Sequence, residues 1–316
     1  MINIFTLDHG RLVNIQAEEI ATRKPVWVDI IAPSEEERTW VSTTFSISLP
    51  QPEHLRDIEA SARFYEENEE LHVRSDFLRG KEIDARSVIV AFVLSRNILF
   101  SVHDQDLSLF QLFRQRTHGH PELVEDSLDV LIDLYGSDVE FSADALEEVY
   151  VELGSIGGSV LNTNLGDEEA AVVLAKIANS EYLNGRIRRN LMDTRRAISF
   201  LMRSKLLKLN QLEEARQIMQ DIDSLDGHTA FLFDKINFLM NTTVGFININ
   251  QNKIVRLFSV ASVAMLPPTL IASIYGMNFK HMPELEWANG YPFSLLLMAL
   301  SVALPFWMFH RKGWLK

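Results

Sequence analysis

Two long uncharged segments near the C-terminal end of the chain limit its possible folds more than any other feature of the sequence. They cover residues 257–275 and 291–310, and neither contains an Asp, Glu, Lys or Arg residue. A helix needs about 20 apolar residues to cross the hydrocarbon core of a bilayer, which is about 30 Å thick. A buried helix of a soluble domain would also be apolar, but two such segments in succession favour membrane-spanning helices over about 255–275 and 291–310.

Basic residues predict the orientation of these two helices. They precede the first segment and follow the second, whereas Lys280 is the only Lys or Arg residue of the intervening loop, residues 276–290. Loops rich in Lys and Arg stay in the cytoplasm. We therefore expect a multi-pass membrane protein with a lipid bilayer as partner, both termini in the cytoplasm and the loop 276–290 outside. The flanking basic residues are Lys253, Arg256, Arg311, Lys312 and Lys316.

The remainder of the chain predicts two cytoplasmic parts. Residues 1–115 alternate short β-rich runs with turn signals such as Asp8-His9-Gly10, which predicts a small α/β domain with a mixed or largely antiparallel sheet. Residues 116–252 have helical periodicity and form the second part, and 253–312 form the membrane hairpin. From Gln211 to about Tyr275 the scarcity of Pro and Gly predicts one very long helix, about 100 Å at about 1.5 Å per residue. The fold class is therefore an α+β cytoplasmic domain with a long helical stalk and a C-terminal two-helix hairpin.

Composition excludes several classes of function. The formal net charge is −13, and no basic face suits a nucleic acid. The chain has no cysteine, so disulfides, thiolate nucleophiles and Cys-ligated zinc are excluded. No phosphate-binding loop motif occurs, and the histidines show neither a triad nor a metal-ligand spacing. We expect neither an enzyme nor an organic cofactor.

Polar and small residues recur every three or four positions along the first apolar segment, which places them in one stripe on a helix. The stripe consists of Asn252, Val255, Ser259, Ser262, Leu266, Thr269, Ser273 and Gly276. One hairpin cannot enclose a pore, and small or hydroxylated residues are also typical of helix packing in membranes. The stripe alone is consistent with a helix–helix interface or with a pore lining, and a symmetric ring of hairpins would satisfy both.

The segment Tyr275-Gly276-Met277-Asn278, followed by "MPELEW", resembles the signature of the CorA family of divalent-cation (magnesium/cobalt) transport proteins, especially its enterobacterial-type members. Further similar stretches are "DIEASARF" (57–64), "LMDTRRA" (191–197), "GFININQN" (245–252) and "LPPTLIAS" (266–273). The resemblance implies a homopentameric, funnel-shaped channel in the bacterial inner membrane. It would admit Mg²⁺, and also Co²⁺ and Ni²⁺, passively under the membrane potential.

The resemblance also implies roles for particular residues. Gly276, Met277 and Asn278 become the selectivity filter at the outer mouth, where Asn278 carboxamides would hydrogen-bond to the water around a hydrated Mg²⁺. Apolar rings would close the pore by excluding water. The implied pore lining is Asn252, Val255, Phe258, Ser262, Leu266, Thr269 and Ser273.

Three further expectations concern carboxylates. Glu284 and Glu286 of the outer loop would attract cations to the mouth, although a solvated loop explains them equally well. The resemblance implies that cytoplasmic Mg²⁺ closes the channel, so that Mg²⁺ is a regulatory as well as a transported ion. Asp221 and Asp223 lie in the stretch that would supply its ligands.

Two other functions remain open from the sequence. A zinc transporter of the same superfamily would share the hairpin, but Met277 and the lack of a histidine cluster favour magnesium. A membrane-anchored scaffold would use the hairpin only as an anchor, and an anchor does not require a polar stripe.

Overall fold

A seven-stranded mixed sheet forms the N-terminal part of the chain, which we describe from a computed structural model covering residues 1–50, 63–80, 86–119, 123–161, 166–278, 282–283 and 287–313. Its strands run in the order β2-β1-β3-β7-β6-β5-β4. Only the central β3–β7 pair is parallel, so the predicted, largely antiparallel sheet is confirmed. The strands are β1 (Ile2–Asp8), β2 (Arg11–Ile15), β3 (Pro25–Ile31), β4 (Phe64–Glu67), β5 (Glu70–Arg79), β6 (Arg86–Ser95) and β7 (Ile98–His103).

Three tight hairpins set the register of the antiparallel strands. The β1–β2 turn at His9-Gly10 has φ values of 49° and 74°, and the other two hairpin turns also place both residues at positive φ. Such turns match the right-handed twist of the flanking strands. The turn predicted at Asp8-His9-Gly10 is therefore confirmed. Gly10 suits it because glycine adopts a positive φ without a steric penalty.

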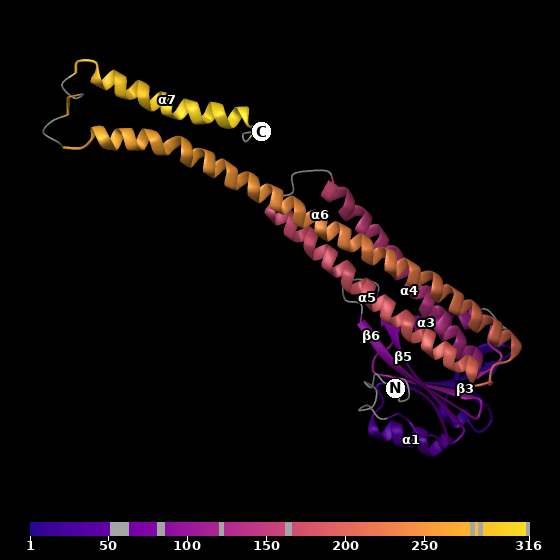
Figure 1. Ribbon diagram of the computed structural model, residues 1–316. Coiled ribbons are helices and arrows are strands. Elements are labelled where there is room, and N and C mark those ends of the chain that lie inside the picture. The colour runs from indigo at the N-terminus through magenta and orange to yellow at the C-terminus, as the bar shows by residue number, and fades with distance from the viewer. Residues whose placement is uncertain are drawn as a thin grey trace. The chain divides into compact units, whose positions relative to one another are not determined.

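Successive side chains of a strand point to opposite faces of the sheet, and apolar residues occur on both faces. On one face Val28, Phe100 and Val102 form a buried cluster with Val41 and Phe45 of α1 (Glu35–Phe45), whose N-terminus carries a Ser34–Glu37 capping box. On the other face Trp27, Phe77 and Phe92 pack with aromatic residues of α3 (Ser108–Gly119) and α4 (Ser127–Leu161). Figure 1 shows the sheet between α1 and these longer helices.

Four long helices make up most of the rest of the chain. They are α4, α5 (Asp167–Arg203), α6 (Leu209–Tyr275) and α7 (Gly290–Arg311). A short 3₁₀ helix, η1 (Ala17–Glu19), follows β2. The 67 residues of α6 confirm the very long helix expected from the sequence. In the described part of the chain, α6 and α7 contain stretches long and apolar enough to cross a membrane. The expected division into residues 1–115, 116–252 and 253–312 stays a prediction.

Packing divides the chain into two compact units. One contains Met1–Leu161 and Val173–Met240, and the other contains Asn162–Val172 and Asn241–Lys316. The sheet, α3, α4 and the first part of α6 belong to the first unit. The apolar end of α6 and α7 belong to the second, which carries the candidate pore residues.

Candidate functional site

The stripe predicted on the first apolar segment lies on an exposed face of α6. All of its members from Asn252 to Gly276 are exposed, and so is Phe258. The large apolar residues among them are strongly exposed, with 71% for Phe258 and 67% for Leu266. Such exposure of apolar side chains calls for a lipid environment or a partner surface.

The opposite side of the same helix stretch is covered. Val260 and Ala264 are buried, and Ile271 is half-buried. At 3.6 residues per turn, these positions lie roughly opposite the candidate stripe. In α7, Ser294 and Phe309 are buried as well. One side of α6 is therefore used for packing within the second unit, and the stripe is left for another partner or for water.

The hydroxyl groups of the stripe donate to the helix backbone. Ser259, Ser262 and Thr269 each donate a hydrogen bond to the carbonyl four residues earlier, at 2.8, 2.9 and 2.8 Å. With its proton used in this way, a hydroxyl oxygen has only lone pairs left for outside groups. The stripe therefore presents hydrogen-bond acceptors, which suit the water molecules around a cation.

Two adjacent prolines lie inside the continuous helix α6. Pro267 and Pro268 have no N–H, so the carbonyls of Val263 and Ala264 lack their usual helical donors. Membrane helices tolerate such gaps when neighbouring groups or water satisfy the freed carbonyls. The helix therefore continues through an interruption of its hydrogen-bond ladder.

A tight turn at Gly276 ends α6 and leads to Asn278. The Gly276 N–H donates to the Ala272 carbonyl at 2.9 Å, and the Met277 N–H donates to the Ile274 carbonyl at 3.2 Å. A Cβ atom at position 276 would lie only 3.2 Å from the Ala272 oxygen, so the turn favours glycine. The carbonyl end of a helix carries about half a negative charge. The end of α6 thus provides a weakly cation-attracting position next to the exposed side chains of Met277 and Asn278.

Aromatic residues occupy both ends of α7. Trp287 lies 5.6 Å from the ring of Phe293, and the guanidinium of Arg311 lies 5.5 Å from the ring of Trp307. Aromatic and basic residues in such positions are typical of membrane–water interfaces. The two loop carboxylates, Glu284 and Glu286, lie outside the described residues.

The two expected regulatory aspartates are in different surroundings. Asp223 forms an ion pair with Arg195 of α5. Asp221 lines a groove between α4 and α6 together with Asp133 and Glu214. Among the residues that the structure describes, no three His, Asp or Glu side chains form a group suited to a metal ion. The roles of Asp221 and Asp223 stay predictions.

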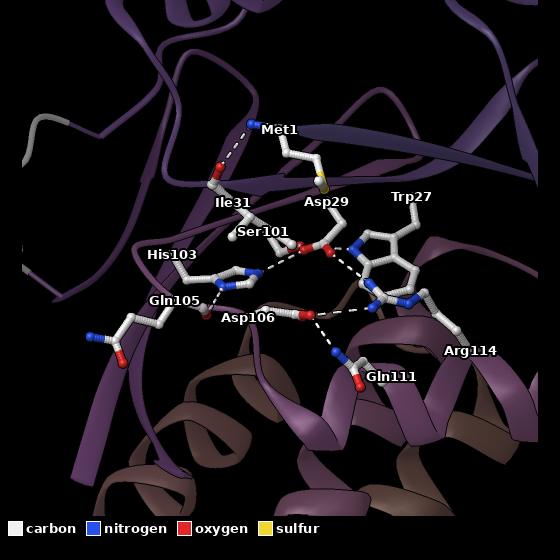
Figure 2. A network of polar contacts seen from close by, with 10 residues as sticks. All are labelled: Met1, Trp27, Asp29, Ile31, Ser101, His103, Gln105, Asp106, Gln111 and Arg114. Atoms are coloured by element: carbon white, nitrogen blue, oxygen red, sulfur yellow. Dashed lines mark hydrogen bonds and ion pairs between the residues drawn. The ribbon is translucent and has the colours of Figure 1, made fainter.

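A buried ionic network lies in the sheet domain. Figure 2 shows Asp29 accepting hydrogen bonds from the Ser101 hydroxyl at 2.7 Å, from His103 Nε2 at 2.8 Å and from Arg114 at 2.9 Å. The other ring nitrogen of His103 lies 2.6 Å from the Gln105 carbonyl oxygen, which can only accept. Both ring nitrogens therefore carry protons. Burial alone would lower the pKa of His103, but the hydrogen bond and charge of Asp29 outweigh burial and raise it.

This network stabilises the fold and is not accessible to a substrate. The side chains of His103 and Asp29 are completely buried, so no substrate reaches them. The sequence showed His103 only as one of several scattered histidines. No local pattern links it to Asp29, because the two residues are 74 positions apart.

Comparisons with known proteins agree with the resemblance seen in the sequence. Residues 23–311 match the model of a family described as CorA-like Mg²⁺ transporter protein. Over their full lengths, the chain is 44% identical to the magnesium transport protein CorA of Pasteurella multocida and 40% identical to that of Escherichia coli K12. The solved structure of the CorA magnesium transporter from Methanocaldococcus jannaschii superposes with a TM-score of 0.81, covering 99% of this chain and 98% of that one at 19% identity. The cytoplasmic domain of ZntB from Vibrio parahaemolyticus has the same fold, with a TM-score of 0.60 over 78% of this chain and 97% of that one at 11% identity.

Proposed function

The chain belongs to the CorA-like Mg²⁺ transporter family, and we propose that it is a channel for passive Mg²⁺ influx across the bacterial inner membrane. The curated relatives that it matches over their full length are named magnesium transport proteins. Two helices of membrane-spanning length, with basic residues outside the hairpin loop, support a multi-pass protein with both termini in the cytoplasm.

The observation that carries the proposal is the exposed stripe of α6. It runs along the side of the helix opposite the packed side and ends next to Gly276, Met277 and Asn278. A membrane anchor would need neither this stripe nor its exposed Ser and Thr residues. This difference favours a channel over a scaffold.

A ring of five chains around a central axis would bring five copies of the stripe together. One hairpin cannot surround a path for ions, so the proposal requires a homo-oligomer, and the family resemblance suggests a pentamer. Exposed aromatic residues on α6, such as Phe231 and Phe233, are consistent with contacts between copies. The pore lining in this assembly would consist of Asn252, Val255, Phe258, Ser262, Leu266, Thr269 and Ser273.

The chemistry of the proposed filter suits Mg²⁺. This ion loses water reluctantly and usually keeps several water molecules when bound. Neutral oxygens at Asn278 and along the stripe would hold hydration water without binding the ion so tightly that it could not leave. The same groups would admit hydrated Co²⁺ and Ni²⁺. Glu284 and Glu286 would raise the local cation concentration at the mouth.

Membrane potential would be a sufficient driving force. Each elementary charge gains about 2.3 kcal/mol per 100 mV, so a divalent cation that moves inward gains about 4.6 kcal/mol per 100 mV. Rising cytoplasmic Mg²⁺ would close the channel, with Asp221 and Asp223 as candidate ligands. The apolar rings at Val255, Phe258 and Leu266 would form the closed, water-free stretch.

The zinc alternative is less well supported. The ZntB domain shares the fold alone, and within the described residues no histidine cluster offers the nitrogen ligands that zinc prefers.

Replacing Asn278 by alanine tests the filter. We expect Asn278→Ala to lose nearly all Mg²⁺ uptake while keeping its assembly, because the exposed side chain contributes little to packing. Asn289→Ala is a matched control, since Asn289 lies in the same connection and makes no capping hydrogen bond to α7. Normal uptake by Asn278→Ala, or an equal loss in both variants, would show that Asn278 is not the filter residue.

A further inference from the structure

A groove rich in carboxyl groups separates α4 from α6 in the first unit. Its volume is about 330 Å³, and its lining includes Asp133 and Glu140 of α4, Glu214 and Asp221 of α6, and Arg116 of α3. Among the described residues that line the groove, Arg116 is the one cation, and it lies 3.7 Å from Glu140. The groove therefore has an excess of acidic groups.

Two of these acids face each other across the groove. Asp133 and Glu214 line it from different helices, and their carboxyl groups lie close enough to hydrogen-bond to each other. Two carboxyl groups can form such a bond only when one of them carries a proton. If both were ionised, each would present only acceptors and the two negative charges would repel each other.

The helices approach closely at this point. A Cβ atom added at Gly136, one turn along α4 from Asp133, would lie 3.6 Å from Ile218 of α6, which is one turn along from Glu214. Ile218 and Val139 are buried beside the groove. The acid pair thus lies at the edge of an apolar contact, where a change in its charge acts directly on helix packing.

Burial, together with the surrounding charges, favours the protonated form of the pair. Burial, and then the charge and hydrogen bond of Glu214, raise the pKa of Asp133 to about 7, and burial also raises the pKa of Glu214. Asp129 of α4 adds to this effect, whereas Arg116 opposes it. Asp129 is itself fixed by Gln211 of α6, whose amide donates to it at 2.6 Å. Glu140 and Asp221 complete the charged groups that line the groove.

We propose that Asp133 and Glu214 form a proton-dependent clasp between α4 and α6, closed while the pair shares one proton and open when both carboxyl groups are ionised. The clasp acts on α6, which continues without interruption to Tyr275. Its consequence for conduction, a dependence of Mg²⁺ flux on cytoplasmic pH, rests on the proposed function. The clasp itself is a property of the helix pair and does not depend on transport.

The experiment measures thermal unfolding of the full-length chain in detergent, with EDTA, at about pH 6 and about pH 8.5, on either side of the pKa of Asp133. Asp133→Asn and Glu214→Gln each remove one negative charge and keep a hydrogen bond across the groove. We expect the fall in Tm between the two pH values to be smaller in each variant than in the wild type. The double variant should reduce the fall no further, because either change alone already removes the repulsion between two ionised carboxyl groups.

Glu148→Gln is the matched control, because it removes the same charge from an exposed position on α4. It should keep the wild-type fall in Tm. The proposal is overturned if the single variants also keep the wild-type fall, or if their effects add in the double variant. It is overturned as well if the difference between wild type and variants appears only when Mg²⁺ replaces EDTA, since a metal ion would then hold the pair. None of these readouts requires transport, so a failure of the clasp is distinguishable from a failure of the proposed function.

Discussion

Replacing Asp138 by asparagine should remove a large pH-dependent loss of stability from the protein. Asp138 of α4 is completely buried where α4 meets β5 and α5. Its carboxyl group accepts hydrogen bonds from the Asn190 amide at 2.8 Å, the Thr194 hydroxyl at 3.1 Å and the Leu78 N–H at 3.4 Å. Burial outweighs these three donors and raises the pKa of Asp138 from 3.8 to about 7.

The sign and size of the effect follow from that pKa. Between about pH 4 and pH 7 the folded chain holds a proton on Asp138 that the unfolded chain has released, so stability falls as the pH rises through this window. A shift of about three pKa units, at 1.36 kcal/mol each, amounts to about 4 kcal/mol once the pH is above 7. The loss is absent at about pH 4, where the carboxyl group is protonated in both states.

Asparagine has nearly the same shape as a protonated aspartate and cannot ionise. Its carbonyl oxygen would still accept from Asn190 and Thr194. We therefore expect Asp138→Asn to unfold at a higher temperature than the wild type at about pH 8, by roughly 8 °C at about 2 °C per kcal/mol. At about pH 4 the two proteins should differ little.

The assay is thermal unfolding followed by tryptophan fluorescence in detergent. Trp27 is completely buried in the same unit as Asp138, so its emission reports on this region. Thr194→Val is a useful comparison, because it removes one donor and should raise the pKa of Asp138 further, which extends the loss of stability to higher pH and enlarges it. Equal pH dependence of Tm in the wild type and Asp138→Asn would refute the reasoning.

Three other predictions concern the gate, the ionic network and the assembly. Leu266→Asp should place a wettable ring in the closed stretch, so flux assays should detect a cation leak at high internal Mg²⁺. An assembled variant that still closes would rule out a hydrophobic gate there. His103→Gln should destabilise the chain by about 3 kcal/mol at pH 6, measured by unfolding, because Asp29 loses a buried charged partner. Since the folded pKa of His103 is raised, the difference should shrink as the pH rises through that pKa, and a pH-independent difference would contradict the charged state. Native mass spectrometry in mild detergent should show a homopentamer, and a stable monomer or dimer would argue against the shared pore.

Much of the fold could be predicted from local sequence signals. The Ser34–Glu37 capping box, the turn at His9-Gly10 and the scarcity of Gly and Pro along α6 each act within a few residues of the chain. The membrane hairpin was visible because the bilayer requires long apolar runs. The position of the stripe on α6 also followed from helical periodicity.

The buried polar groups could not be predicted in the same way. Asp138 is separated from Asn190 by 52 positions, so no local pattern indicates that it would be buried. The pairing of Asp133 with Glu214 likewise depends on how α4 packs against α6. The direction of the Ser262 and Thr269 hydroxyls is set by backbone carbonyls of the helix, and spacing alone does not reveal it.

Potential-driven Mg²⁺ influx into proteoliposomes is the most direct test of the central claim. The purified full-length chain would be reconstituted without ATP, a potassium gradient with valinomycin would set the potential, and an internal indicator would report Mg²⁺. The account predicts influx that increases as the interior becomes more negative and that nearly disappears with Asn278→Ala. Influx no faster than in protein-free liposomes at any potential would contradict it.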